Sequence, residues 1–174
     1  MMSVTFKLRD WSLSDCESLA RHADNIRIWS NVRDVFPHPY TPNDAVVFIS
    51  SVISKPRPAV DRAIDINGEA VGGIGLVMQQ DVERISAEIG YWLSENFWNK
   101  GIMTEAVKQM AEYAFTCFPL SKLFAPVYEH NLASMKVLEK AGFEKEGVLK
   151  KAAIKNGIVI DLHYYGLIKK YSYS

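Results

Sequence analysis

The chain has 174 residues, 48% of them hydrophobic and 23% charged, a balance that favours one folded domain over a disordered chain. Its 20 Lys and Arg residues equal its 20 Asp and Glu residues, so the net charge gives no indication of bulk binding to nucleic acid or to an anionic membrane. Two cysteines without a Cys-x-x-Cys pair or a His/Cys cluster argue against a disulfide framework, and no metal is expected.

The chain begins with a predicted strand and three predicted helices. Residues 4–8 alternate apolar and polar side chains, as a strand does. Ser14 is the expected cap of a helix through residue 23, with Glu17 at the capping-box position, and residues 25–32 suit a short second helix. Thr41 should cap a third helix, because Pro42 then occupies the first helical position of a segment that runs to about residue 54.

The hydrophobic period then changes to two residues. Residues 59–66 and 70–78 predict a β-hairpin around Asn67-Gly68. Residues 84–93 predict the next strand, and Gly90 inside it indicates a bulge or the close approach of a backbone or ligand. Its side chains should alternate between two faces: Ala87, Ile89, Tyr91 and Leu93 on one, and Ser86, Glu88, Gly90 and Trp92 on the other.

The second half alternates helices and strands. Residues 102–118 predict a strong helix, residues 123–128 a buried strand, and residues 131–141 a helix with Ala133 facing inward and Gly142 as its stop signal. Residues 143–150 and 158–168 should be the last two strands, joined through Asn156-Gly157. This order predicts an α/β (α+β) fold, a mixed sheet with helices on its faces.

A tight turn at residues 97–105, which contains Gly101, connects strand 84–93 to helix 102–118. Such a turn gathers unpaired backbone N–H groups at the positive end of a helix dipole. That combination is a seat for a pyrophosphate. A cofactor with a diphosphate and a reactive tail along the preceding strand fits this arrangement.

Four segments carry a resemblance to a known family: Phe36-Pro-His-Pro-Tyr-Thr41, Glu88-Ile-Gly-Tyr-Trp-Leu93, Trp98-Asn-Lys-Gly-Ile-Met-Thr-Glu-Ala106 and Asn131-Leu-Ala-Ser-Met-Lys-Val-Leu-Glu-Lys-Ala-Gly-Phe143. In this order and spacing they resemble the GNAT superfamily of N-acetyltransferases, and within it the Rim-type ribosomal-protein N-terminal-alanine branch. The resemblance implies one GNAT domain over residues 1–174. Its sheet would be largely antiparallel, with helices on both faces and a bulged fourth strand.

The resemblance also implies a function. The expected reaction transfers an acetyl group from acetyl-CoA, the co-substrate, to a primary amine by direct attack in a ternary complex. The favoured acceptor is a protein or peptide N-terminal α-amine. The chain lacks a signal-peptide core near its N-terminus and any apolar run of transmembrane length, so a cytoplasmic protein is expected. A monomer or a homodimer is expected.

The expected cofactor contacts follow from the chemistry of acetyl-CoA. Backbone groups of the strand end would pair with the pantetheine amides, and the turn would take the diphosphate. Trp98 and Met103 stand where the superfamily's turn usually has Gln or Arg and a small residue. The cofactor-binding candidates are Tyr91, Trp92, Leu93, Trp98, Asn99, Lys100, Gly101, Ile102, Met103, Thr104, Asn131 and Ser134.

Two residues are the catalytic candidates. Glu88 is the best general base, since a half-buried carboxylate can accept a proton directly or through water; the alternative is a surface carboxylate paired with Arg84 or a lysine. Ser134 matches the serine that the Rim-type branch uses as acid, or it merely bonds a backbone group. Leu138 replaces the tyrosine acid of many members, and Ala153 stands near the position of the branch's glutamate.

Other positions have weaker roles. Asn131 suits a helix N-cap as well as a pantetheine contact. Asp161 and His163 alternate on one face of the last strand and would assist catalysis or form an inert pair. The acceptor pocket is expected from four residues: Trp29, Arg33, Phe36 and Tyr40. Trp29 and Phe36 are equally suited to the core.

Two rival functions remain open. One is acetylation of a small amine, such as a polyamine, an amino acid or an antibiotic. The other is a catalytically silent acyl-CoA-binding or sensing module, because Leu138 and Ala153 cannot supply the missing acid and glutamate.

Overall fold

The computed structural model describes residues 5–170 and divides them into two compact units. Unit 1 holds residues 5–75 and 91–106, and unit 2 holds residues 76–90 and 107–170. Three elements run from one unit into the other: β3 (Glu69–Met78), β4 (Ser86–Leu93) and α4 (Ile102–Cys117). The expectation of one domain over the whole chain stays a prediction.

The seven strands follow the order β1-β2-β3-β4-β5-β7-β6. The pairs β1–β2, β2–β3, β5–β7 and β6–β7 are antiparallel, whereas β4 and β5 are parallel. Parallel neighbours need a crossover connection, which α4 provides between β4 and β5. The predicted mixed, largely antiparallel sheet is therefore confirmed.

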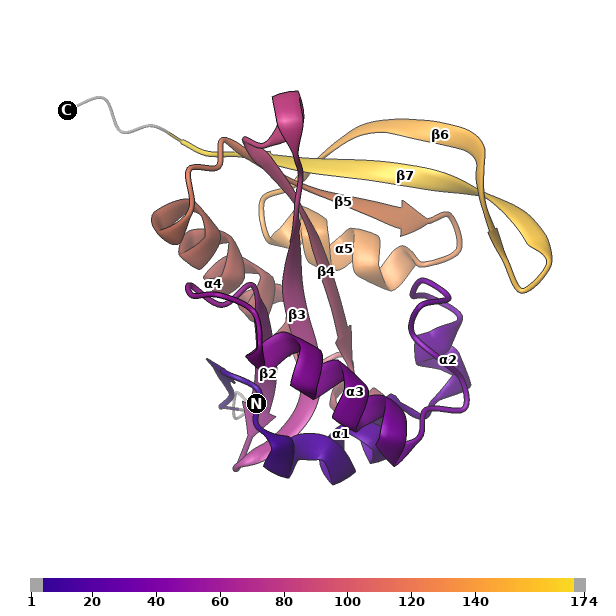
Figure 1. Ribbon diagram of the computed structural model, residues 1–174. Helices are drawn as coiled ribbons and strands as arrows, with labels where there is room; N and C mark the ends of the chain where they lie inside the picture. The colour runs from indigo at the N-terminus through magenta and orange to yellow at the C-terminus, as the bar shows by residue number, and fades with distance from the viewer. Residues whose placement is uncertain (1–4, 171–174) are drawn as a thin grey trace. The chain divides into compact units, whose positions relative to one another are not determined.

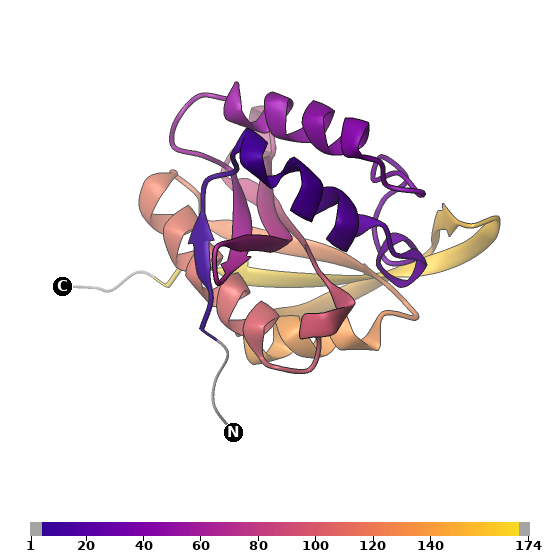
Figure 2. The same cartoon turned by 90° about the horizontal axis from the view of Figure 1, so that it is seen from below.

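Unit 1 packs helices on strands. Figures 1 and 2 show α1 and α3 side by side on the same face of its strands, in indigo and purple. Their buried side chains, such as Leu19 and Ile49, meet the small strand residues Ala63 and Ala70 in one hydrophobic core. The elements that lie wholly in this unit are β1 (Lys7–Arg9), η1 (Leu13–Asp15), α1 (Cys16–Ala23), α2 (Ile26–Trp29), α3 (Pro42–Ile53), β2 (Asp61–Ile66) and η3 (Glu95–Phe97).

Local signals at the helix starts were partly right. The predicted cap at Thr41, followed by Pro42 in the first turn, is confirmed, and Asp44 completes a capping box that was not predicted. The expected cap at Ser14 is wrong: the capping box joins Ser12 and Asp15, and a 3-10 turn leads into α1. Asp15 determines this earlier start, because its carboxylate bonds the Ser12 N–H and the Arg9 guanidinium.

Two other boundaries in unit 1 differ from the expectation. The second helix ends at Trp29 instead of residue 32, because the chain continues in turns of the tighter type, with the Val32 N–H donating to the Trp29 carbonyl. The first strand begins at Lys7, and Val4 lies outside the described residues. The hairpin of β2 and β3 is confirmed, with Asn67 and Gly68 both in the left-handed region.

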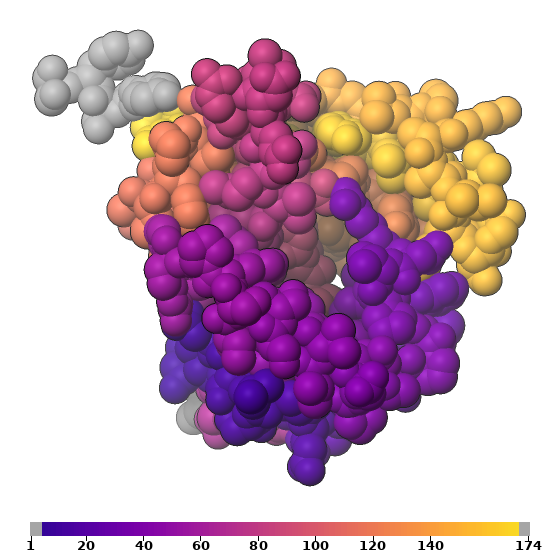
Figure 3. Space-filling view, in the orientation of Figure 1, coloured from indigo at the N-terminus to yellow at the C-terminus, as the bar shows by residue number. Residues whose placement is uncertain are grey.

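Unit 2 contains the remaining elements: η2 (Asp81–Glu83), β5 (Lys122–Tyr128), α5 (Leu132–Lys140), β6 (Glu144–Lys155) and β7 (Ile158–Ile168). β6 is longer than the predicted strand over residues 143–150, because a register shift between Leu149 and Ala153 lets the strand continue to the Asn156-Gly157 turn. Figure 3 shows the β6–β7 hairpin, in orange and yellow, at the molecular surface.

Helix α5 ends as expected, but the side chains that it buries are not all the expected ones. Gly142 has a φ of 93°, and the Phe143 N–H donates to the Leu138 carbonyl, which is a Schellman-type stop. Ala133 is exposed, not inward, and Met135 is buried with Leu138 in its place. Leu138 was predicted inward, and Met135, three positions earlier, shares its helix face, whereas Ala133 is two positions from Met135 and so faces away.

Candidate functional site

The end of β4 is the first part of the candidate site in unit 1. Tyr91 and Trp92 are half-buried and Leu93 is buried. A Cβ added at Gly72 would lie 2.6 Å from the Trp92 carbonyl oxygen, so β3 approaches this strand end closely. Gly90 is exposed, and a Cβ there would meet none of the described atoms within 4 Å. The fourth-strand bulge stays a prediction.

The turn after β4 contains two residues in the left-handed conformation. Asn99 and Gly101 both lie in the left-handed region, with φ of 60° and 77°. Helix α4 begins directly afterwards, and the first N–H groups of any helix have no intrahelical acceptor. Ile102 and Met103 are buried and Thr104 is half-buried, so the Met103 side chain packs inward where the family usually has a small residue.

Trp98 joins the turn to the strand. Its indole Nε1 donates a hydrogen bond of 2.7 Å to the Leu93 carbonyl. The Arg27 guanidinium of α2 lies 5.1 Å from the Trp98 ring centre and forms an ion pair with Glu95. Trp98 therefore has a structural task that the usual Gln or Arg would not perform in the same way. The contact of Arg27 with Trp98 was not predicted, because no local motif indicates a contact between residues 71 positions apart.

Lys100 points back onto its own turn. Its Nζ donates to the Asn96 carbonyl at 2.8 Å and lies 5.2 Å from the Phe97 ring centre. In this arrangement the ammonium bonds the residues just before the turn and so helps to fold it.

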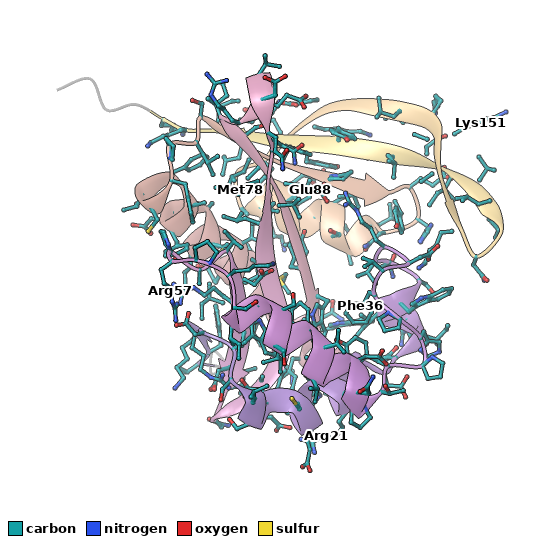
Figure 4. The ribbon with its side chains drawn as sticks, viewed as in Figure 1. Arg21, Phe36, Arg57, Met78, Glu88 and Lys151 are labelled. Atoms are coloured by element: carbon teal, nitrogen blue, oxygen red, sulfur yellow. The ribbon has the colours of Figure 1, made fainter. Side chains whose placement is uncertain are left out.

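The acceptor candidates of unit 1 fall into two groups. Tyr40 is only 7% exposed and belongs to the core, and burial followed by nearby Asp44 raises the pKa of its hydroxyl to about 12. Phe36 is half-buried between Tyr40 and Trp92, at ring-centre distances of 4.8 and 5.8 Å. Phe36, labelled in Figure 4, thus brings a predicted acceptor residue against a predicted cofactor residue.

Trp29 and Arg33 complete the acceptor set. The Trp29 ring lies 5.9 Å from the His38 ring, while Arg33 is exposed. The Trp29 side chain therefore lies against the loop at residues 37–41.

The start of α5 is the first part of the candidate site in unit 2. Asn131 is the N-cap, and its side-chain oxygen accepts the Ser134 N–H at 3.1 Å. The Ser134 side chain is half-buried in the first turn. Leu138 is fully buried in the core, which rules out a catalytic role at the position of the usual tyrosine.

The strand registers of unit 2 separate the base candidates. Glu88 is paired with Phe124 of β5, and Phe124 lies opposite Gly166 of β7. Since neighbours in register share a face, Glu88 and Tyr164 lie on one face and His163 on the other. Phe124 and Tyr164 stack at 5.9 Å beside Glu88, whose position Figure 4 marks on β4.

Asp161 and His163 are therefore poorly placed to assist Glu88. The Asp161 carboxylate accepts bonds from Lys150 Nζ and the Lys151 N–H, and these hold its pKa below the usual value. Within residues 5–170, the buried Nδ1 of His163 has no hydrogen-bond partner. The two residues share a face of β7, as predicted, but the Asp161 carboxylate is bonded to Lys150 and Lys151 of β6.

These features match those of a known family. A model described as an acetyltransferase (GNAT) domain matches residues 5–144. The chain belongs to the GNAT acetyltransferase family. The Gly101 turn, the Asn131 helix cap and the β4–α4–β5 crossover described above all lie within the matched GNAT region.

Individual relatives agree with this membership. The putative ribosomal N-acetyltransferase YdaF of Bacillus subtilis is 32% identical over 61% of this GNAT chain and 62% of its own. The L-amino acid N-acetyltransferase AaaT of Escherichia coli is 29% identical over 65% and 71%. The fold resembles that of Mycobacterium smegmatis RimJ, solved in complex with CoA-disulfide, with a TM-score of 0.83 at 24% identity over 94% of this chain and 81% of RimJ.

The matches to curated relatives are partial. The chain spans 57%, 56% and 40% of the length of three Bacillus relatives. Within the described residues, no helix is both long and apolar enough to cross a membrane.

Proposed function

We propose that this chain is an acetyl-CoA-dependent N-acetyltransferase that acts on a primary α-amine. Family membership supports acetyl transfer, and the observation that carries the proposal is the segment from β4 to α4. Its half-buried strand end, left-handed turn and helix start are joined by the Trp98–Leu93 hydrogen bond. This segment offers main-chain groups for a pantetheine arm and helix N–H groups for a diphosphate.

The side-chain positions indicate which groups bind acetyl-CoA in this proposal. Backbone groups of residues 91–93 bind the pantetheine amides, and backbone N–H groups of residues 98–104 bind the diphosphate. The buried Met103 and the folded-back Lys100 leave this task mainly to the main chain. Asn131 adds a pantetheine contact while it caps α5.

Each chemical step has a candidate residue. Glu88 takes a proton from the acceptor ammonium, directly or through water, so that the free amine nitrogen attacks the thioester carbon. A backbone N–H of residues 91–93 stabilises the oxyanion. The new C–N bond replaces the C–S bond, and Ser134 donates a proton to the departing thiolate.

The acceptor class rests on two supports. One relative is named a putative ribosomal N-acetyltransferase, which agrees with a protein N-terminus as the acceptor, whereas another is named for L-amino acids, which agrees with the rival small-molecule acceptor. Phe36, packed against Trp92, offers an aromatic wall that suits a peptide terminus. A small-molecule amine and a silent acyl-CoA sensor are the competing functions.

The test is release of CoA thiol from acetyl-CoA. Peptides with a free N-terminus, the same peptides with a blocked N-terminus, amino acids, polyamines and aminoglycosides serve as acceptors. The proposal expects release with free but not blocked peptides. Release with polyamines or aminoglycosides alone would contradict the acceptor class, and acetyl-CoA binding without release would favour a sensor.

A further inference from the structure

A pocket lies within unit 1, beside the end of β4 and directly before the turn at residues 98–104. Its volume is about 560 Å³, and it is formed by the end of α1, the start of β3 and the residues that follow β4. None of its lining residues belongs to the acetyl-transfer set. Three of them, His22, Glu69 and Ser94, form a continuous hydrogen-bonded chain.

In this hydrogen-bonded series of side chains, His22 lies between Ser94 and Glu69. His22 Nδ1 lies 2.9 Å from Ser94 Oγ, and His22 Nε2 lies 2.9 Å from Glu69 Oε1. Glu69 also accepts a hydrogen bond from Arg21. These bonds from His22 and Arg21 lower the pKa of Glu69, so its carboxylate is ionised at neutral pH and acts only as an acceptor.

The tautomer of His22 follows from that carboxylate. In the neutral ring, Nε2 carries the proton and donates it to Glu69, which leaves the Nδ1 lone pair facing the Ser94 hydroxyl. Ser94 then donates its hydrogen to His22. A hydroxyl on a neutral imidazole, itself oriented by a carboxylate, is the arrangement that activates serine nucleophiles.

The surroundings hold these groups in place. The Ser94 N–H donates to the Val71 carbonyl at 2.8 Å, which anchors the backbone directly after β4. Ser94 is 4% exposed and the His22 side chain 11%, and the Phe97 ring packs against the imidazole at 6.3 Å. Arg21 and Asn96 also line the pocket. The Arg21 side chain, labelled in Figure 4, points away from the ribbon.

We propose that Ser94 is a base-activated nucleophile that reacts with small activated esters or phosphonyl groups entering this pocket. With an ester, Ser94 Oγ bonds to the carbonyl carbon while His22 Nδ1 takes the hydroxyl proton. The ester C–O bond breaks, and His22 returns that proton to the leaving alkoxide. Water, deprotonated by His22, then releases the acid from Ser94. The side-chain amide of Asn96, which also lines the pocket, is the candidate oxyanion donor.

A fluorophosphonate probe tests this directly on the full chain, without acetyl-CoA or an amine. Ser94 Oγ would displace fluoride from phosphorus, and the adduct is located by peptide mass spectrometry. The expected result is a single adduct on Ser94 of the wild-type chain, lost in Ser94→Ala. His22→Gln should slow labelling on the order of 10²-fold, the usual contribution of a general base.

The matched control is Ser50→Ala, since Ser50 is exposed on α3 and should leave labelling unchanged. Circular dichroism of each variant separates misfolding from lost reactivity, and mapping of the wild-type adduct does not depend on any variant. The proposal would be overturned by the absence of an adduct or by an adduct on another residue. It would also be overturned if Ser94 were labelled at the same rate in the wild type and in His22→Gln. Acetyl-transfer activity is a separate result, because the probe does not report on it.

Discussion

In the proposed mechanism, Glu88 removes the proton from the acceptor ammonium. It lies half-buried on β4, on the face that carries the stacked Phe124 and Tyr164 rings. Glu88→Gln keeps the shape but cannot accept a proton, so we expect kcat/KM to fall on the order of 10²-fold or more. The rise of rate with pH should also disappear, as steady-state kinetics across pH would show. An unchanged profile would assign the base to another group; Glu112→Gln, exposed on α4, is the control.

Ser134 can be tested without disturbing its helix. The capping bond to Asn131 uses the backbone N–H of Ser134, so Ser134→Ala keeps the cap. We expect kcat to fall about 10²-fold, because the proton donor to the thiolate is lost. Ser134→Cys retains an S–H donor and should recover part of the rate. Equal turnover in wild type and Ser134→Ala would remove Ser134 from the mechanism.

At the scale of elements, we propose that the joint between β4 and the turn, which is the Trp98–Leu93 hydrogen bond, positions the turn for the cofactor. Trp98→Phe keeps the ring but deletes the N–H that bonds the Leu93 carbonyl. A typical hydrogen bond contributes about 1 kcal/mol, so affinity for acetyl-CoA should fall about fivefold by calorimetry. Arg27→Met removes the cation over the ring but leaves the indole bond, and its effect should be smaller. Equal affinity in wild type and Trp98→Phe would show that the joint does not position the turn.

Elements were predictable where the signal is local. Asn67-Gly68, Asn156-Gly157 and the Thr41-Pro42 start each depend on φ preferences or caps contained in a few residues. The misplaced cap at Ser14 has the opposite cause. Asp15 accepts a hydrogen bond from Arg9, which also bonds Asp65, a residue far along the chain. Rules based on neighbouring residues cannot predict that contact.

The candidate site divides in the same way. The turn after β4 and the cap at Asn131 follow from short motifs, and both were placed correctly on their elements. The contacts of Trp98 with Arg27, and of His22 with Glu69 and Ser94, were not foreseen. They join residues 47 to 72 positions apart, which the chain brings together only by folding.

For the whole molecule, the buried ion pair of Arg9 and Asp65 should control acid stability. Burial alone would raise the pKa of Asp65, but hydrogen bonds from Arg9 and the Gly68 N–H outweigh it and lower the pKa. A lowered folded-state pKa gives stability that is complete above the unfolded value, about 4, and is lost as pH falls through the folded value. Asp65→Asn should therefore be less stable at pH 7, by about 1–3 kcal/mol, and lose less on acidification.

Urea unfolding at several pH values measures this difference. Glu17→Gln, an exposed change on α1, should keep the wild-type slope. If Asp65→Asn and the wild type lost stability in parallel between neutral and acid pH, the Arg9–Asp65 pair would not be the acid-sensitive contact.

Acetyl transfer to an α-amine is the central claim. The most direct measurement incubates the chain with acetyl-CoA and a peptide with a free N-terminus, then locates the added acetyl group by fragment mass spectrometry while CoA release is followed. We predict one acetyl group on the α-nitrogen for each CoA released, and none on the same peptide with a blocked N-terminus. Acetyl groups on lysine side chains only, or binding of acetyl-CoA with no transfer to any amine, would contradict it.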